Sequence, residues 1–309
     1  MRRGVSITAA ICISAACAGA GHAVTQQTGL IVFNAITNGS GYNQLYVADL
    51  DRGRVRQLTH GRAGGWDPSW SPDGSQIAFD WVSDGPCNSP ACSRIWLIRA
   101  DGSRRRPFTP ANLRCEGAAW SPRGDRIAYV QWQPYGNGGN RASIYVRTID
   151  GAEVHRLTFA KAFDAAPVWS PDGLQIEFSR EGKGSSGNWI MNADGSNQHR
   201  LAHGNPDTAI VSWSPDGRRF TGSRNYGVYG NRYLSVTLNT DGSGERLLLR
   251  GGFGPVWSPD GRYVAFLPEE EVVVGQGSVS VVRADGTGRR KLFSGNFTEP
   301  RNLDWRSQK

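Results

Sequence analysis

The pentapeptide WSPDG occurs at residues 70–74, 169–173, 213–217 and 257–261, and its variant WSPRG occurs at residues 120–124. The last residues, NLDWRSQK (302–309), supply one more tryptophan without the rest of the motif. The six tryptophans are spaced 44 to 50 residues apart and are Trp70, Trp120, Trp169, Trp213, Trp257 and Trp305. A repeat of this length built from short strands is typical of the blades of a β-propeller, each of which is a four-stranded sheet.

Each repeat contains four short strand-like segments in the same order. In the repeat that holds Trp70 they are DPSWS (67–71), QIAFD (76–80), IWLIRA (95–100) and RRRPFT (104–109). The residues SPDG suit a tight turn between the first two segments, and a DG pair suits a turn between the last two. The serine and aspartate of WSPDG recur at equivalent turns, so we interpret them as turn residues rather than as a catalytic pair.

The two ends of the sequence complement each other. GLIVF (29–33) matches the second strand of a repeat, and NLDWR (302–306) matches the first strand. We therefore predict an all-β fold, a six-bladed β-propeller of four-stranded antiparallel blades, with the six tryptophans as structural anchors of the inner strands. The ring would be closed by N-terminal strands pairing with a first strand from the C-terminus, which would leave no open sheet edge.

Residues 1–23 have the pattern of a secretory signal peptide. Arg2 and Arg3 precede an apolar stretch, and small residues follow at Gly21 and Ala23. We expect cleavage to leave one propeller domain, residues 24–309, without a membrane span and located in the periplasm or secreted. The alternative is a lipid anchor on Cys17.

Cysteine usage and charge add two expectations. Cys87 and Cys92 in PCNSPACS are the natural disulfide pair in an oxidising compartment, which leaves Cys115 free or in a rearranged pairing with one of them. The net charge of +8 falls to +6 without the expected leader, which carries two arginines and no acid. This mild excess does not indicate nucleic-acid binding. We interpret the basic run Arg104–Arg106, which follows a DG turn, as a solvated turn.

WSPDG followed by an IAF-like strand (77–79), then IWLIRADG (95–102) and RLT (156–158), resembles the TolB-type periplasmic β-propeller repeat. The resemblance covers essentially the whole chain after residue 23. It implies a non-catalytic, exported scaffold that binds an envelope protein or peptide, with the peptidoglycan-associated lipoprotein as the partner of the family's propeller. TolB also has a separate N-terminal domain that contacts TolA. We expect no such domain here, because about six residues separate the predicted cleavage site from the first strand.

The connections between the second and third segments, and between the fourth segment and the next repeat, vary in length and composition. Alternation of antiparallel strands places both sets at one end of the ring, which we call the variable end; the short turns define the opposite turn end. Aromatic and arginine side chains, which are enriched at interface hot spots, make the variable end the expected binding surface. The candidates are Trp81, Trp132, Tyr135, Arg141, Arg224, Tyr226, Tyr229 and Arg232. For Trp81 and Trp132, packing between blades is the alternative.

Catalytic and metal sites are not expected. After residue 23, His155 and His199 fall in outer strands, and His60 and His203 fall across the ring from each other, so we predict no metal and no cofactor. Acidic residues that precede inner strands could form a ring of carboxylates at the channel mouth: Asp67, Glu116, Asp164, Asp207 and Glu299. Their spacing singles out no acid/base pair. The alternatives are sugar stacking on Trp132, Tyr135 or Tyr226, and a glycan-cleaving or other hydrolytic activity of these carboxylates.

Overall fold

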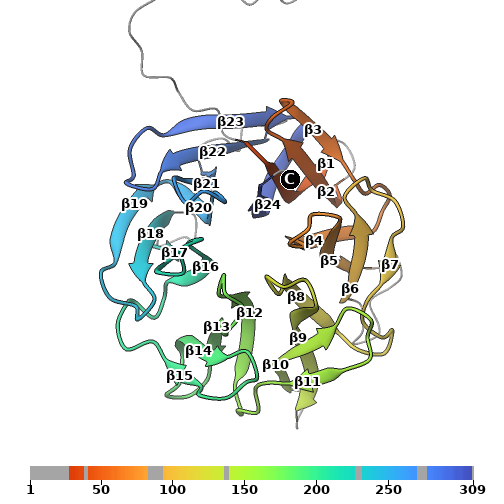
Figure 1. Ribbon diagram of the computed structural model, residues 1–309, viewed down its shortest axis with the longest axis vertical. Coiled ribbons are helices and arrows are strands. Elements are labelled where there is room, and N and C mark those ends of the chain that lie inside the picture. Colours follow the sequence, from red (N-terminus) through yellow and green to blue (C-terminus); the bar gives the residue numbers. More distant parts are fainter. Residues whose placement is uncertain are drawn as a thin grey trace, which may run out of the picture.

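The computed structural model describes residues 28–37, 41–82, 93–135, 139–226, 232–269 and 277–307, and only the backbone of residues 134–135 and 139–140. These residues form 24 β-strands arranged around a common centre (Figure 1). Within these ranges there is no helix of the length and hydrophobicity needed to cross a bilayer. Tyr229 and the disulfide candidates Cys87 and Cys92 lie outside the described residues.

The strands are arranged in groups of four, and each group is an antiparallel sheet. The four strands of a group lie in order from the centre outward (Figure 1). The first sheet contains β24 (Phe297–Arg306), β1 (Leu30–Thr37), β2 (Asn43–Asp49) and β3 (Arg54–Gln57). The second contains β4 (Gly64–Trp70), β5 (Gln76–Val82), β6 (Ser93–Arg99) and β7 (Arg106–Pro107). We name each group, or blade, after its inner strand.

Two blades are joined in an eight-stranded sheet by a single parallel pair, Ala142 with Phe163. The β8 blade contains β8 (Cys115–Trp120), β9 (Arg126–Tyr135), β10 (Gly139–Thr148) and β11 (Val154–Arg156). The β12 blade contains β12 (Phe163–Trp169), β13 (Gln175–Glu181), β14 (Gly187–Asn192) and β15 (His199–Arg200).

The last two sheets have the same order of four strands. The β16 blade contains β16 (Ala209–Trp213), β17 (Arg219–Asn225), β18 (Tyr233–Asn239) and β19 (Arg246–Arg250). The β20 blade contains β20 (Gly252–Trp257), β21 (Tyr263–Pro268), β22 (Gly277–Arg283) and β23 (Arg290–Gly295).

The β24 blade combines strands from the two ends of the described chain. β24 pairs antiparallel with β1, with Trp305 opposite Ile31 and Arg306 opposite Leu30. Leu303 and Trp305 are buried in a core cluster with Ile31 and Phe33. The strand pairing that the sequence predicts between NLDWR and GLIVF is therefore present.

The WSPDG motif forms the turn that its composition predicts. In the β4 blade, Ser71 Oγ donates to Asp73 Oδ1 (2.6 Å) and accepts from the backbone N–H of Gln76 (2.9 Å). The same serine–aspartate bond, also 2.6 Å, recurs in three other copies: Ser170–Asp172, Ser214–Asp216 and Ser258–Asp260. In WSPRG, where Arg123 replaces the aspartate, Ser121 Oγ donates instead to Asp125 (2.7 Å). These hydrogen bonds explain the motif as a turn.

The motif tryptophans are all buried, and five of them form hydrogen bonds to a neighbouring blade in one of two ways. Where the residue before one tryptophan is polar, its side chain accepts a hydrogen bond from the backbone N–H of the motif tryptophan in the neighbouring blade. The three pairs are Asp304 to Trp70 (2.6 Å), Ser69 to Trp120 (3.3 Å) and Ser212 to Trp257 (3.3 Å). The indole N–H groups of Trp70, Trp120 and Trp257 have no hydrogen-bond partner within the described ranges.

The other three tryptophans follow blades in which the corresponding residue is apolar, and they use the indole instead. Trp169 Nε1 donates to the Ala119 carbonyl (3.1 Å), and Trp213 Nε1 donates to the Val168 carbonyl (3.2 Å). Trp305 Nε1 donates to the Thr28 carbonyl (3.2 Å). Five of the motif tryptophans thus donate one hydrogen bond to a neighbouring blade, through either the backbone or the ring, whereas Trp305 donates to the residue that precedes β1 of its own blade by two positions.

Candidate functional site

The variable end contains every exposed aromatic side chain of the described residues. Tyr42 lies in the β1–β2 connection and is 41% exposed, and Tyr226 follows β17 and is 43% exposed. Phe159, between β11 and β12, is 68% exposed. The other large exposed apolar residues lie elsewhere: Val154 and Leu247 in outer strands and Leu174 in a turn. Exposed aromatic groups are therefore concentrated on one end of the molecule.

Phe159 is held in place by Arg156. The Arg156 guanidinium lies 4.8 Å from the centre of the Phe159 ring, and it also donates to the Thr158 carbonyl (2.7 Å) and to Ser143 Oγ (3.1 Å). A side chain fixed in this way loses little rotamer freedom when a partner covers it. Phe159 was not among the binding residues predicted from the sequence. The available signal was its position after HRLT, where the equivalent residue after QLT is His60.

A second cluster surrounds Trp132 in β9. Glu116 connects it to Arg114, because Glu116 Oε2 accepts from Trp132 Nε1 (2.8 Å) while Oε1 accepts from Arg114 Nε (2.9 Å). The Arg114 guanidinium also lies 4.0 Å from the centre of the Trp132 ring. On the other side, Phe163 of β12 contacts Trp132 edge to face, with ring centres 4.9 Å apart. Trp132 is only partly buried, so it combines packing between blades with some accessible surface.

Two carboxyl groups, those of Asp67 in β4 and Asp80 in β5, lie together in the β4 blade. Burial and the charge of Asp67 hold the pKa of Asp80 well above its usual range, and lost hydration together with the charge of Glu116 raises the pKa of Asp67. Asp80 is buried and accepts the backbone N–H of Gly117 with both oxygens (3.1 and 2.9 Å). Asp67 accepts from the Asn302 side chain. These bonds connect the β4 blade to β8 on one side and to β24 on the other, which is a structural role for the pair.

Asp67 and Gly117 occupy irregular positions of the inner strands. Both lie three residues before a motif tryptophan, both have positive φ (46° and 66°), and the strand register shifts there. A bulge leaves backbone groups outside the ladder, and the Asp80 carboxyl satisfies the N–H of Gly117 at one of them. Asp80 was not among the residues predicted from the sequence, although it directly follows the apolar IAF segment (77–79).

The remaining carboxylates of the expected ring are dispersed. Asp164 is buried and forms a two-pronged ion pair with Arg180 (2.6 and 2.9 Å). Asp207 is exposed, and Glu299 is exposed and paired with Arg301 (3.2 Å). Of the five predicted mouth carboxylates, Asp67 and Glu116 interact electrostatically, and the other three have separate environments.

The other predicted binding residues differ in their surroundings. Trp81 is 7% exposed, packs edge to face on Phe79 (5.9 Å) and is covered by the Arg105 guanidinium at 4.2 Å, as its packing alternative implied. Arg224 pairs with Glu245 (2.8 Å).

Three more of the predicted binding residues remain predictions: Arg232, Arg141 and Tyr135. Arg232 is exposed beside Tyr226, whose N–H donates to the Arg232 carbonyl (2.9 Å). Arg141 lies in β10, opposite Gln133 of β9. Tyr135 ends β9, and its side chain lies outside the described part.

Cysteine and histidine residues do not gather at this end. Cys115 is a buried free thiol, and burial raises its pKa to about 12. His155 and His199 lie in the outer strands β11 and β15, as expected. Within the described ranges, no group of three or more His, Cys, Asp or Glu side chains has a geometry suited to a metal ion.

Comparison with known proteins agrees with this architecture. A family model described as the TolB beta propeller domain matches residues 93–305, so the chain belongs to that family. Among curated relatives, the Tol-Pal system protein TolB of Anaeromyxobacter dehalogenans is 30% identical over 44% of this chain and 28% of its own length. The uncharacterized peptidase YuxL of Bacillus subtilis is 28% identical over 36% of this chain and 16% of its own length. The chain thus spans less than a third of either relative.

Solved structures show the same fold. TolB from Acinetobacter baumannii has a TM-score of 0.71 at 20% identity, covering 91% of this chain and 67% of that one. An oligogalacturonate lyase in complex with manganese has a TM-score of 0.57 at 14% identity, covering 87% of this chain and 76% of that one. At these identities the likeness concerns the fold alone, because propellers carry binding proteins and enzymes alike.

Proposed function

We propose that this TolB-like propeller is an exported, non-catalytic scaffold that binds a segment of an envelope protein at its variable end. The observation that carries the proposal is the distribution of exposed aromatic side chains, since Tyr42, Phe159 and Tyr226 all lie there. Aromatic and arginine side chains dominate interface hot spots, and Arg156 already fixes Phe159. The proposal includes a six-bladed ring closed by the pairing of β24 with β1.

Family membership supports the class of partner that we propose. A TolB relative is named as a protein of the Tol-Pal system; for this chain, a peptidoglycan-associated lipoprotein or a peptide from it is the corresponding partner we propose. Export through residues 1–23 would bring the two into the same compartment. The carboxyl pair Asp67–Asp80 enters the proposal as a structural element, because Asp80 is buried and engaged by a backbone N–H.

A pull-down from an envelope extract tests the proposal with paired variants. The bait Phe159→Ala/Tyr226→Ala removes two exposed aromatic groups from the variable end. The control bait Leu174→Ala/Leu247→Ala removes side chains of similar exposure, 58% and 49%, from the turn end and an outer strand. Both variants remove little buried surface, so unchanged melting temperatures are expected.

We expect one or more envelope proteins to be retained by the wild type and the control but lost with the aromatic variant. Two hot-spot residues at about 2 kcal/mol each correspond to a loss of affinity of more than about a hundredfold. A direct titration of the retained protein would measure this loss. Equal retention by both variants would place the binding surface elsewhere and contradict the proposal.

A further inference from the structure

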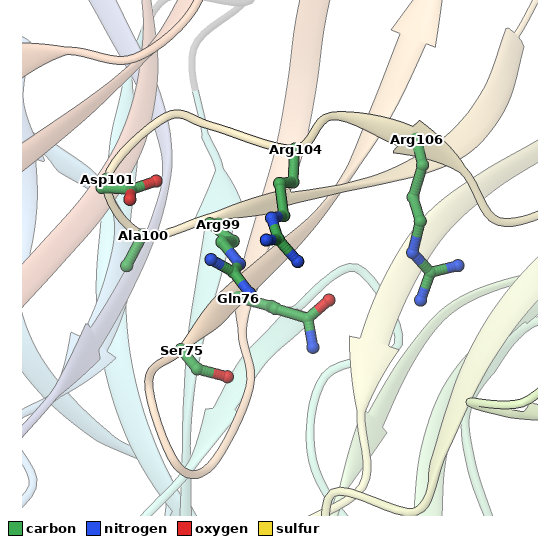
Figure 2. A pocket seen from close by; sticks show the side chains of 7 residues that line it. All are labelled: Ser75, Gln76, Arg99, Ala100, Asp101, Arg104 and Arg106. Carbon is green, nitrogen blue, oxygen red and sulfur yellow. The ribbon is translucent and has the colours of Figure 1, made fainter.

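An arginine-lined pocket opens on the turn end of the β4 blade, opposite to the variable end. It has a volume of about 580 Å³ and lies between Gln76, the first residue of β5, and the segment from β6 to β7, which contributes Arg99, Arg104 and Arg106. Figure 2 shows Arg104 and Arg106 extending from that segment in the same direction, with the Gln76 amide and the Arg99 guanidinium also in the pocket.

The pocket has a net positive charge. Three arginines line it against a single carboxylate, that of Asp101. Asp101 accepts from the backbone N–H of Ser103 (2.8 Å), and hydrogen bonds from Ser103 lower its pKa, so it stays ionised within the turn. Among the described residues, no carboxylate lies within ion-pair distance of Arg99, Arg104 or Arg106. These guanidinium groups are therefore available to a ligand.

The backbone at Arg104 is unusual for an arginine. Its φ is 52°, in the left-handed region that side chains with a Cβ rarely adopt. The equivalent position after the DG turn in three other blades also has positive φ, and it holds Asn197, Gly244 or Gly288, which are residue types that tolerate this conformation. An arginine at this position costs conformational energy, and such outliers are concentrated at functional sites.

A neighbouring pocket extends the basic surface. It has a volume of about 620 Å³, shares Ala100 and Asp101 with the first pocket, and is lined by Arg52, Arg54 and Arg56 from the β2–β3 turn and β3. Arg56 donates to the Ala100 and Asp101 carbonyls (2.7 and 2.8 Å), which fixes the turn between the two pockets. Arg52 pairs with Asp49 (2.6 Å). A ligand with more than one anionic group could therefore contact both pockets.

We propose that the pocket of Gln76, Arg99, Arg104 and Arg106 binds the phosphate group of a phosphorylated ligand. Guanidinium groups match the oxygens of phosphate in a two-pronged geometry and stay charged at any physiological pH. Three arginines that line one pocket suit a group with two negative charges better than a single carboxylate, and the Gln76 amide adds a neutral donor. The site is independent of the aromatic surface at the other end.

The test uses the full chain with two probes that distinguish free phosphate compounds from lipid headgroups. Calorimetric titration with inorganic pyrophosphate reports binding of a small anion, and co-sedimentation with vesicles that contain phosphatidic acid, whose phosphate is a monoester, against phosphatidylcholine vesicles, reports headgroup binding. The informative variant is Arg104→Gly, since glycine suits the positive φ and should not weaken the fold. Arg218→Gln, an exposed arginine in another turn at the same end, is the matched control.

We expect at least one of the two probes to bind the wild type, and Arg104→Gly to weaken that binding about tenfold or more while Arg218→Gln retains it. Loss confined to pyrophosphate identifies a soluble phosphate ligand, and loss confined to vesicles identifies a lipid headgroup. If neither probe binds the wild type, or if both variants weaken binding equally, the site is overturned, because unspecific attraction to a basic surface would depend on either arginine alike.

Discussion

Replacement of Trp305 by alanine tests whether the C-terminal strand is an integral part of the propeller. Trp305 and Trp169 make a matched pair, because they are 6% and 7% exposed. Each indole also donates one hydrogen bond to a backbone carbonyl, at 3.2 Å for Trp305 and 3.1 Å for Trp169. They differ in connectivity: Trp169 continues directly through its turn into β13, whereas β24 contacts β1, whose residues are far away in sequence.

Truncation of a buried tryptophan to alanine costs about 3–5 kcal/mol of unfolding free energy. For a domain of this size each kcal/mol lowers the melting temperature by about 2–4 °C, so a fall of roughly 10 °C is expected. Because burial and hydrogen bonding are alike at the two sites, Trp305→Ala and Trp169→Ala should cost nearly the same. Calorimetry and urea unfolding of both variants provide the measurement.

A different result would refute the closure of the ring by β24. If Trp169→Ala has the full effect while Trp305→Ala changes the unfolding free energy by less than about 1 kcal/mol, well below a core truncation, β24 does not hold the structure together. Trp305→Phe serves as a control for packing, since it keeps an aromatic ring and loses the indole hydrogen bond. It should lie between the wild type and Trp305→Ala in stability.

Three carboxyl groups with little access to water provide further tests. Burial raises the pKa of Glu177 well above its usual range, and its Oε1 has no partner within the described ranges. Glu177→Met should therefore raise the unfolding free energy by about 1–3 kcal/mol at neutral pH. That gain should shrink as the pH falls toward the usual glutamate pKa, where the unfolded chain also binds the proton; an equal gain by urea unfolding at both pH values would contradict this. Asp164→Ala should lower the unfolding free energy by about 3–5 kcal/mol, measured by thermal melts, because it leaves Arg180 buried and unpaired. Adding Arg180→Met should recover part of this loss. A double variant no more stable than the single variant would argue against the pair. Lost hydration raises the pKa of Asp304 to about 6, so the wild type should lose stability as the pH rises through that value. In Asp304→Asn this loss of stability should disappear. If the variant has the same pH profile as the wild type, titration of Asp304 does not cause the loss.

The architecture could be predicted from the sequence because turn chemistry repeats. The SPDG and DG pairs mark the hairpins of each repeat, and the spacing of the tryptophans sets the length of a blade. The pairing of GLIVF with NLDWR was also visible, because each segment matches one strand of the repeat. These are local signals, and every one of them recurs several times.

The site could be predicted only in part, because its contacts join different strands and blades. Trp81 and Trp132 looked alike in the sequence, but Trp81 is two residues after Phe79 and shares its buried face, whereas Trp132 is three residues after Tyr129 and has the opposite orientation in the strand. The contact between Arg156 and Phe159 and the basic pocket around Arg104 depend on side-chain directions and on a left-handed backbone. No repeated pattern encodes these features.

The two kinds of tryptophan hydrogen bond make the blades unequal building blocks. A blade that ends its inner strand with Ser69 or Ser212 before the tryptophan supplies a side-chain acceptor, while one with Ala119 or Val168 supplies a backbone carbonyl to an indole. Exchanging whole repeats within the chain would place a blade next to a neighbour whose residues form the other kind of hydrogen bond between blades. The order of the repeats therefore matters for how the blades pack. A chain built from copies of a single repeat would have only one kind of hydrogen bond between its blades.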